Sequence, residues 1–210
     1  TVEYAKSDTA AVPTNGWQTS IEFSGLSGGT YYYFFARVKE SATHGAGTTA
    51  NARIRTNQGA FPETLDIADG SITVDDGTTS GTIKVTQGSK TYDDLPKATQ
   101  ISISGTSANT ITVNTSCNIT FSGVTITPAE GAWQNPMNIT AGTVTLTLAD
   151  GTENTLQAPH TNGFAAVRVD ANAALIINGS TGKLIANGGN GYVQSGRAPL
   201  GGSGAGIGAN

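Results

Sequence analysis

The fold of this chain is most constrained by short segments in which apolar residues alternate with small polar ones. They recur about every eight to twelve residues from Leu65 almost to the C-terminal end, separated by Gly, Asn, Asp or Ser. Because side chains of a strand point alternately to its two faces, each segment predicts a β-strand with one buried face. The clearest segments are residues 72–74, 83–85, 101–103, 111–113, 119–121 and 144–148.

No helical stripe separates these segments, so we expect their strands to stack as a solenoid. Three short strands per coil are typical of a right-handed parallel β-helix, and we predict this all-β fold for residues 58–210, with an incomplete C-terminal end. Residue 67 and residues 72–74 and 83–85 are assigned to the first coil. The later coils comprise residues 101–121, 124–148 and 166–186, with loops at 127–136 and 156–164 and a Gly-rich tract from residue 187.

Residues 1–57 have a different organisation, and we expect a domain boundary near residues 56–61. Four strands are predicted there, at residues 2–7, 19–23, 30–38 and 48–56. The third of these and the turn before it resemble the corner and sixth strand of a fibronectin type III domain. The resemblance lies in Leu26, Thr30, Tyr32, Phe34, Ala36 and Val38.

This resemblance implies a partial fibronectin type III-like β-sandwich in which Tyr32 is structural, because the family's tyrosine hydroxyl reaches back to the chain upstream. The family's first two strands are missing. We therefore expect either a truncated module or one whose edge is completed by another segment.

Charge and hydropathy exclude several classes of partner. A net charge of -4 and a pI near 5.0 leave no basic stripe, so we expect no nucleic-acid partner. The longest apolar run, residues 173–177, is far shorter than a bilayer span, so we expect no membrane insertion. A single cysteine, Cys117, excludes an intrachain disulfide, and it shares the parity of Ile119, which predicts a buried thiol.

A second resemblance spans roughly residues 65–210. Residues 144–156 (VTLTLADGTENTL), 166–169 (AVRV) and 174–184 (ALIINGSTGKL) resemble the carbohydrate-binding, polysaccharide-lyase-like β-helix domains of gut and cellulolytic bacteria. Residues 101–126 and 204–208 resemble repeats of large surface proteins from Gram-positive gut bacteria. The resemblance implies a secreted module that contacts polysaccharide, in some members with calcium.

Trp133 is the first candidate for ligand binding. It lies in a loop with few other apolar residues, where an exposed indole stacks well on the apolar face of a sugar ring. Gln134 and Asn135 beside it offer amides to sugar hydroxyls. The alternative is a tryptophan that caps the edge of a coil. Tyr192, in the Gly-rich tract, is a second aromatic candidate.

Asp150, Glu153 and Asn154 are the candidate metal ligands. Their oxygens are of the kind that calcium prefers, and the resemblance implies calcium as the metal. Asp-Gly pairs at strand ends more commonly form turns, so a purely structural role stays open. Asn154 has a further alternative, since asparagines at the bends of a β-helix satisfy backbone groups of neighbouring coils.

The sequence does not favour an enzyme. His44 and His160 lie in separate polar loops with no acid or nucleophile near them in the sequence. Arg168 and Asp170 alternate on one strand, where a solvated ion pair between coils explains them. Hydrolysis of glycosidic bonds takes a pair of carboxylates, and no such pair is recognisable.

The sequence thus predicts a noncatalytic extracellular binding segment of a bacterial surface protein, secreted or attached to the cell surface. We expect a monomer within a larger multidomain chain, with polysaccharide or a host glycoprotein as the partner. An adhesin segment that binds a host protein and a structural spacer are the alternatives. An ice-binding face is disfavoured because the Thr-x-Thr segments do not recur at one fixed interval.

Overall fold

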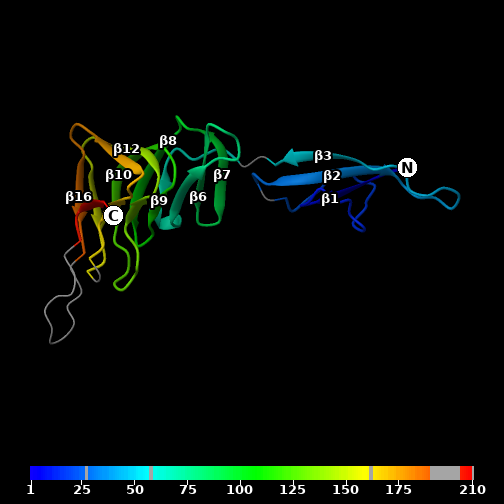
Figure 1. Cartoon of the computed structure of the whole chain (residues 1–210). Helices are drawn as coiled ribbons and strands as arrows, with labels where there is room; N and C mark the ends of the chain where they lie inside the picture. Colours follow the sequence, from blue (N-terminus) through cyan, green and yellow to red (C-terminus); the bar gives the residue numbers. More distant parts are fainter. Residues whose placement is uncertain (27, 57–58, 161–162, 190–203, 210) are drawn as a thin grey trace. The chain divides into compact units, whose positions relative to one another are not determined.

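The computed structural model describes residues 1–26, 28–56, 59–160, 163–189 and 204–209 (Figure 1). The fold is all-β, with 50% of residues in strands and 2% in helix. The chain divides into two compact units, Thr1–Ala60 and Phe61–Asn210. No helix in the described ranges is long and apolar enough to cross a membrane.

The N-terminal unit is built on an antiparallel sheet of strands β1 (Val2–Ser7), β2 (Tyr31–Val38) and β3 (Ala50–Arg55), with β2 in the centre. Tyr32 and Phe35 of β2 are buried on opposite faces of the sheet, and Ala5 of β1, which pairs with Phe35, is buried as well. An isolated bridge between Tyr4 and Gln18 continues the sheet beyond β1.

The strand expected at residues 19–23 does not form. Side-chain hydrogen bonds occupy this segment instead, because the Gln18 amide donates to the carbonyls of Ser20 (3.0 Å) and Glu22 (2.7 Å). The Ser20 hydroxyl in turn accepts the Glu22 backbone N–H at 3.0 Å. Polar side chains that bond nearby backbone groups compete with a strand ladder, which explains the difference from the prediction.

The C-terminal unit contains one sheet in which five short strands pair in parallel. These strands are β5 (Ile72–Asp76), β9 (Ile111–Val113), β11 (Met137–Ile139), β14 (Val167–Val169) and β17 (Ile207–Ala209). Their register stacks equivalent positions, so that Ile72 pairs with Ile111, Ile111 with Met137, and Met137 with Val167.

The second sheet of this unit is organised around the long strand β10 (Cys117–Ile126). Its first half pairs in parallel with β12 (Gly142–Leu148), and its second half with β13 (Glu153–Gln157). Further parallel pairs join β10 to β8 (Gln100–Ser107), β8 to β4 (Leu65–Asp66), β12 to β15 (Ala173–Asn178) and β13 to β16 (Lys183–Asn187).

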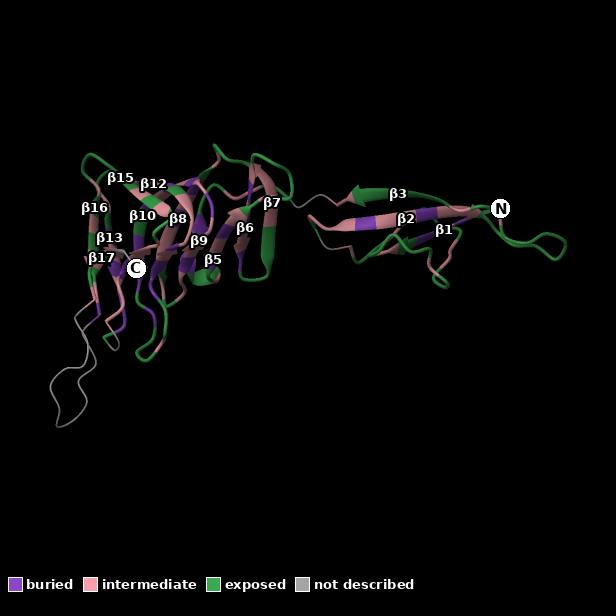
Figure 2. Cartoon of the chain, viewed as in Figure 1, coloured by how far each residue is buried: buried purple, intermediate pink, exposed green. Residues whose placement is uncertain are grey.

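The core of the C-terminal unit consists of the inward residues of these strands, seen as buried bands that alternate along them in Figure 2. Ile101, Ile119 and Leu146 occupy equivalent positions of three successive strands, and each is fully buried. Burial of one such side chain contributes on the order of 1.5–3 kcal/mol, so the stacked apolar rows are the main source of stability. Cys117 is buried in this core, as its parity predicts.

The structure corrects the assignment of coils in two places. Residues 83–85 belong to β6 (Thr82–Gln87), which pairs antiparallel with β5 and with β7 (Lys90–Pro96) and is not the third strand of a first coil. The turn after β5 is too short for a parallel crossover, because the Gly77 N–H bonds the Thr82 carbonyl (3.0 Å) and returns the chain directly beside β5. Residue 67 begins the short 3-10 helix η1 (Ile67–Asp69).

The second correction concerns β10, which joins two segments that the sequence assigns to different coils. Residues 119–121 and 124–126 form one strand, which bends where its register shifts between Phe121 and Val124. Gly123 supplies the bend with a φ of 74°, in the region that glycine adopts without strain.

Candidate functional site

Three loops of the C-terminal unit lie beside one another where strands of the two sheets are joined. They are residues 127–136 between β10 and β11, residues 158–160 and 163–166 between β13 and β14, and residues 188–189 and 204–206 between β16 and β17. Backbone hydrogen bonds connect the second loop to the end of β16 and to the third segment, since Ala158 N–H donates to the Asn187 carbonyl (2.8 Å) and Gly189 N–H donates to the Phe164 carbonyl (2.8 Å).

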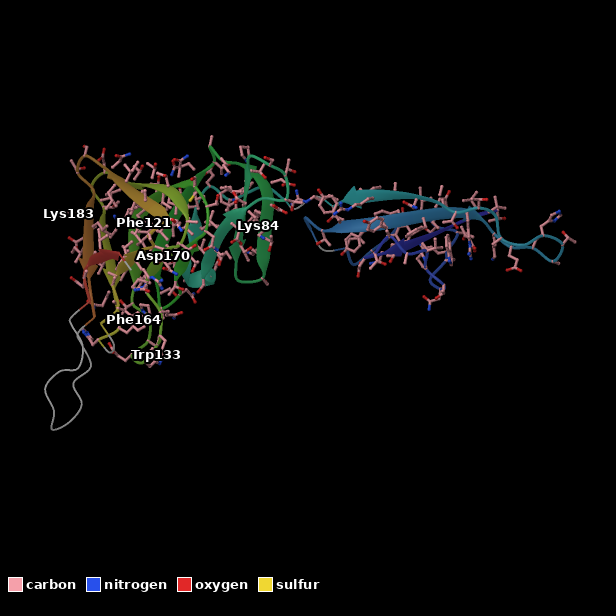
Figure 3. All side chains as sticks on the ribbon, in the orientation of Figure 1. Lys84, Phe121, Trp133, Phe164, Asp170 and Lys183 are labelled. Carbon is pink, nitrogen blue, oxygen red and sulfur yellow. The ribbon has the colours of Figure 1, made fainter. Side chains whose placement is uncertain are left out.

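Trp133 is at the exposed tip of the first loop, with 78% of its surface accessible. Its ring meets that of Phe164 from the second loop edge to face, with the centroids 6.2 Å apart and the planes at 89°. Figure 3 labels both rings at the same end of the unit, away from Phe121 in the core. An edge-to-face contact stabilises the position of the indole and leaves most of it open to a ligand.

The two amides next to Trp133 have different positions. Gln134 is exposed, as a ligand contact requires. Asn135 is only 9% exposed, and its side-chain amide donates to the Ala165 carbonyl at 2.7 Å. Asn135 is therefore buried and hydrogen-bonds the first loop to the second. The residues next to it in the sequence do not reveal this positioning function.

Glu130 and His160 form a second contact between the same two loops. The Glu130 carboxylate accepts the backbone N–H of His160 at 3.1 Å, and its other oxygen lies 3.9 Å from His160 Nε2. Both side chains are exposed, each with 59% of its surface accessible. We expected His160 to have no acid near it, because Glu130 lies thirty residues earlier in the chain.

The cluster of Glu130, Trp133, Gln134, His160 and Phe164 is called the loop site below. It combines an exposed indole with a carboxylate, an imidazole and a primary amide on the same two loops. Tyr192, the other aromatic candidate, lies outside the described residues.

The three candidate metal ligands differ in their burial and in their contacts. Asn154 is fully buried, and its side-chain oxygen accepts the Val124 N–H at 2.9 Å while its NH2 group donates to the Lys183 carbonyl at 3.1 Å. Its oxygen is thus bonded to a backbone N–H and turned away from solvent. These contacts are the ones expected of an asparagine that hydrogen-bonds backbone groups of neighbouring strands.

Asp150 bonds to the neighbouring turn. Its carboxylate accepts both the backbone N–H and the hydroxyl of Thr181, each at 3.1 Å, and these hydrogen bonds lower the pKa of Asp150. Glu153 is exposed at the start of β13. Across the described part of the chain, no three His, Cys, Asp or Glu residues gather in a group that could hold a metal ion.

The remaining charged candidates make local contacts. Arg168 Nε and Asp170 Oδ1 lie 2.8 Å apart and form an ion pair. The pair joins residues at the end of one strand, whereas the sequence suggested a pair between coils. His44 Nδ1 lies 2.8 Å from the hydroxyl of its neighbour Thr43.

Comparison of the chain with protein-family models, with curated proteins and with solved structures finds no match.

Proposed function

We propose that this chain is a noncatalytic extracellular binding segment of a bacterial surface protein, and that it contacts polysaccharide through the loop site. The proposal includes a right-handed parallel β-helix for the C-terminal unit and a partial fibronectin type III-like module for the N-terminal unit. The observation that carries it is the exposed indole of Trp133, which two loops of a rigid scaffold hold in place.

The strand pairing supports the β-helix. Parallel neighbours recur in both sheets of the C-terminal unit, and equivalent apolar positions stack along them. A right hand is proposed because nearly all crossover connections between parallel strands of one sheet have it. For the N-terminal unit, buried Tyr32 and the antiparallel β1-β2-β3 sheet support a fibronectin-like half.

The chemistry of the loop site suits a sugar better than an apolar ligand. A pyranose ring has an apolar face that stacks on indole, while its hydroxyls need hydrogen-bond donors and acceptors. Gln134 supplies both, and Glu130 supplies an acceptor. Phe164 fixes the indole on one side, which lowers the entropic cost of ordering it when the sugar binds.

A binding role is favoured over hydrolysis because Glu130 is the one carboxylate of the three loops, and it bonds the His160 backbone. Glycoside hydrolases pair an acid with a second carboxylate at a defined separation. Loops that hold aromatic and amide groups without such a pair retain a glycan and leave its bonds intact.

The test is a glycan array probed with the whole chain, followed by titration of the best ligand. Stacking worth on the order of 1 kcal/mol predicts that Trp133→Ala weakens binding roughly five-fold. Trp17→Ala removes the chain's other tryptophan, from the N-terminal unit, and should leave the affinity unchanged. The proposal fails if Trp133→Ala binds as well as the parent chain, or if the parent chain captures a host protein and no glycan.

A further inference from the structure

A second surface, on the N-terminal unit, has a different chemistry. Tyr31 and Tyr33 of β2 pair with Arg55 and Arg53 of β3, and the parity of the two strands places all four side chains on one face of the sheet. The Arg53 guanidinium lies 4.0 Å from the centroid of Tyr31 and 5.9 Å from that of Tyr33, and the Arg55 guanidinium lies 5.7 Å from that of Tyr31. These four residues are called the arginine–tyrosine patch.

We propose that the arginine–tyrosine patch binds an anionic polysaccharide, whose carboxylate or sulfate groups are held by Arg53 and whose rings pack on the tyrosines. This binding site is separate from the loop site and does not depend on it.

The charge of Arg53 supports this proposal. Arg53 is exposed, and no carboxylate of the described residues forms an ion pair with it. A guanidinium that stacks on an aromatic ring keeps its N–H groups at its edge, where they bind carboxylate or sulfate through two parallel hydrogen bonds. The stack on Tyr31 therefore holds the cation in an orientation suited to an anion.

The carboxylate of the three strands lies away from the patch. Within the three strands, Glu3 is the one carboxylate on this face, and it bonds Arg37 at 2.7 Å. Glu3 pairs with position 37, four residues along β2 from Tyr33, which corresponds to about 13 Å. Arg37 itself stacks on Trp17 at 3.8 Å, so its charge is already paired and covered.

The N-terminal unit as a whole is positively charged, as the patch is. Residues 1–60 contain five basic residues and four acidic ones, a net charge of +1 where the complete chain has -4. The basic residues are Lys6, Arg37, Lys39, Arg53 and Arg55, and the acidic ones are Glu3, Asp8, Glu22 and Glu40. An anionic ligand is therefore attracted to this unit more than to the rest of the chain.

A polysaccharide fits the patch better than other polyanions. Tyr31 and Tyr33 are half-buried, and the ring area that the guanidiniums leave uncovered is flat and apolar, of the kind on which sugar rings stack. An acidic peptide would use the charge but would leave the rings uncovered. A protein that binds nucleic acid typically neutralises roughly six to ten phosphates, and two arginines are too few for this.

The experiment measures retention of the whole 210-residue chain by immobilised polygalacturonate and dextran sulfate, with neutral dextran as the uncharged reference. Arg53→Gln should weaken retention by both anionic polymers roughly five- to ten-fold, and added salt should weaken retention of the parent chain. Lys39→Gln is the matched control, because it removes the same charge from an exposed position beyond the end of β2 and should change retention less than two-fold.

Two further variants separate the possible explanations. Trp133→Ala should retain full binding to the anionic polymers, so failure of the loop site would leave this proposal intact. Arg53→Lys should bind less tightly than the parent chain, because it keeps the charge and loses the planar fork. The proposal is overturned if Arg53→Gln with an unchanged melting temperature binds like the parent chain, if the parent chain is not retained, or if polyglutamate of equal charge competes as well as polygalacturonate.

Discussion

The side-chain oxygen of Asn154 accepts the backbone N–H of Val124 at 2.9 Å inside the C-terminal unit, although thirty residues separate the two in the chain. The same side chain donates to the Lys183 carbonyl on its other side. One asparagine thus satisfies backbone groups of the strands before and after its own.

Replacing this asparagine is expected to destabilise the fold. Asn154→Ala leaves the buried N–H of Val124 without its partner, at a cost of about 1–3 kcal/mol, and removes the part-buried bond to the Lys183 carbonyl, so we expect the free energy of unfolding to fall by about 2–4 kcal/mol. Urea denaturation measures the loss. Asn178→Ala, at an exposed position of β15, is the control and should change stability by less than about 0.5 kcal/mol. Equal stabilities for the two variants would contradict the bonding assigned to Asn154.

Asp150 should make stability depend on pH on the acid side. The Thr181 hydrogen bonds lower its pKa in the folded chain below the ordinary value of 3.8, so the stabilisation is fully present above that value and disappears as the pH falls through the folded pKa. We expect the parent chain to melt above Asp150→Asn near pH 6, and the difference to shrink steadily below pH 4. Differential scanning calorimetry from pH 6 to 2 checks this. A difference that stays constant over the range would refute it.

Cys117 should be unreactive while the chain is folded. Burial raises the pKa of its thiol to about 12, and the thiolate is the species that reacts with disulfide reagents. At pH 8 we expect labelling to be many times slower in buffer than in denaturing urea. Rapid labelling of the native chain would show that this part of the core opens readily.

Calcium binding through Asp150 and Glu153 stays a prediction that one measurement tests. An ion bound by the folded chain alone raises the melting temperature. If the two carboxylates hold calcium, the chain should melt at a higher temperature in millimolar calcium than in chelator, and Glu153→Gln should abolish the difference. Equal melting temperatures for the parent chain would exclude the site.

The sequence predicted local features better than pairings between distant segments. Which residues of 72–74 or 117–121 point inward follows from alternation alone, and the structure buries Ile72, Val74, Cys117, Ile119 and Phe121. The predicted place of β6 in a parallel coil was wrong, because β6 pairs antiparallel with β5. The hydrogen bonds of the turn before β6 set this direction, and a pattern of apolar residues does not reveal them.

The candidate site shows the same limit. The polarity of its loop left two alternatives for Trp133, an exposed ring and a cap on the edge of a coil, and its contact with Phe164 depends on which loops the strand register brings together. The burial of Asn135 and the contact between Glu130 and His160 depend on the same register. Residues that lie thirty apart in the chain become neighbours only after the strands have paired.

The pairing of Trp133 with Phe164 makes the loop site sensitive to the number of strand repeats. The two rings come from loops that precede adjacent parallel strands, β11 and β14. A duplication that inserted one more set of strands between them would leave each ladder able to pair, yet it would move the rings a further strand spacing apart, about 4.8 Å. Such a chain would keep its fold and lose its aromatic pair, so a change in repeat number could alter ligand binding during evolution without a change in any side chain of the site.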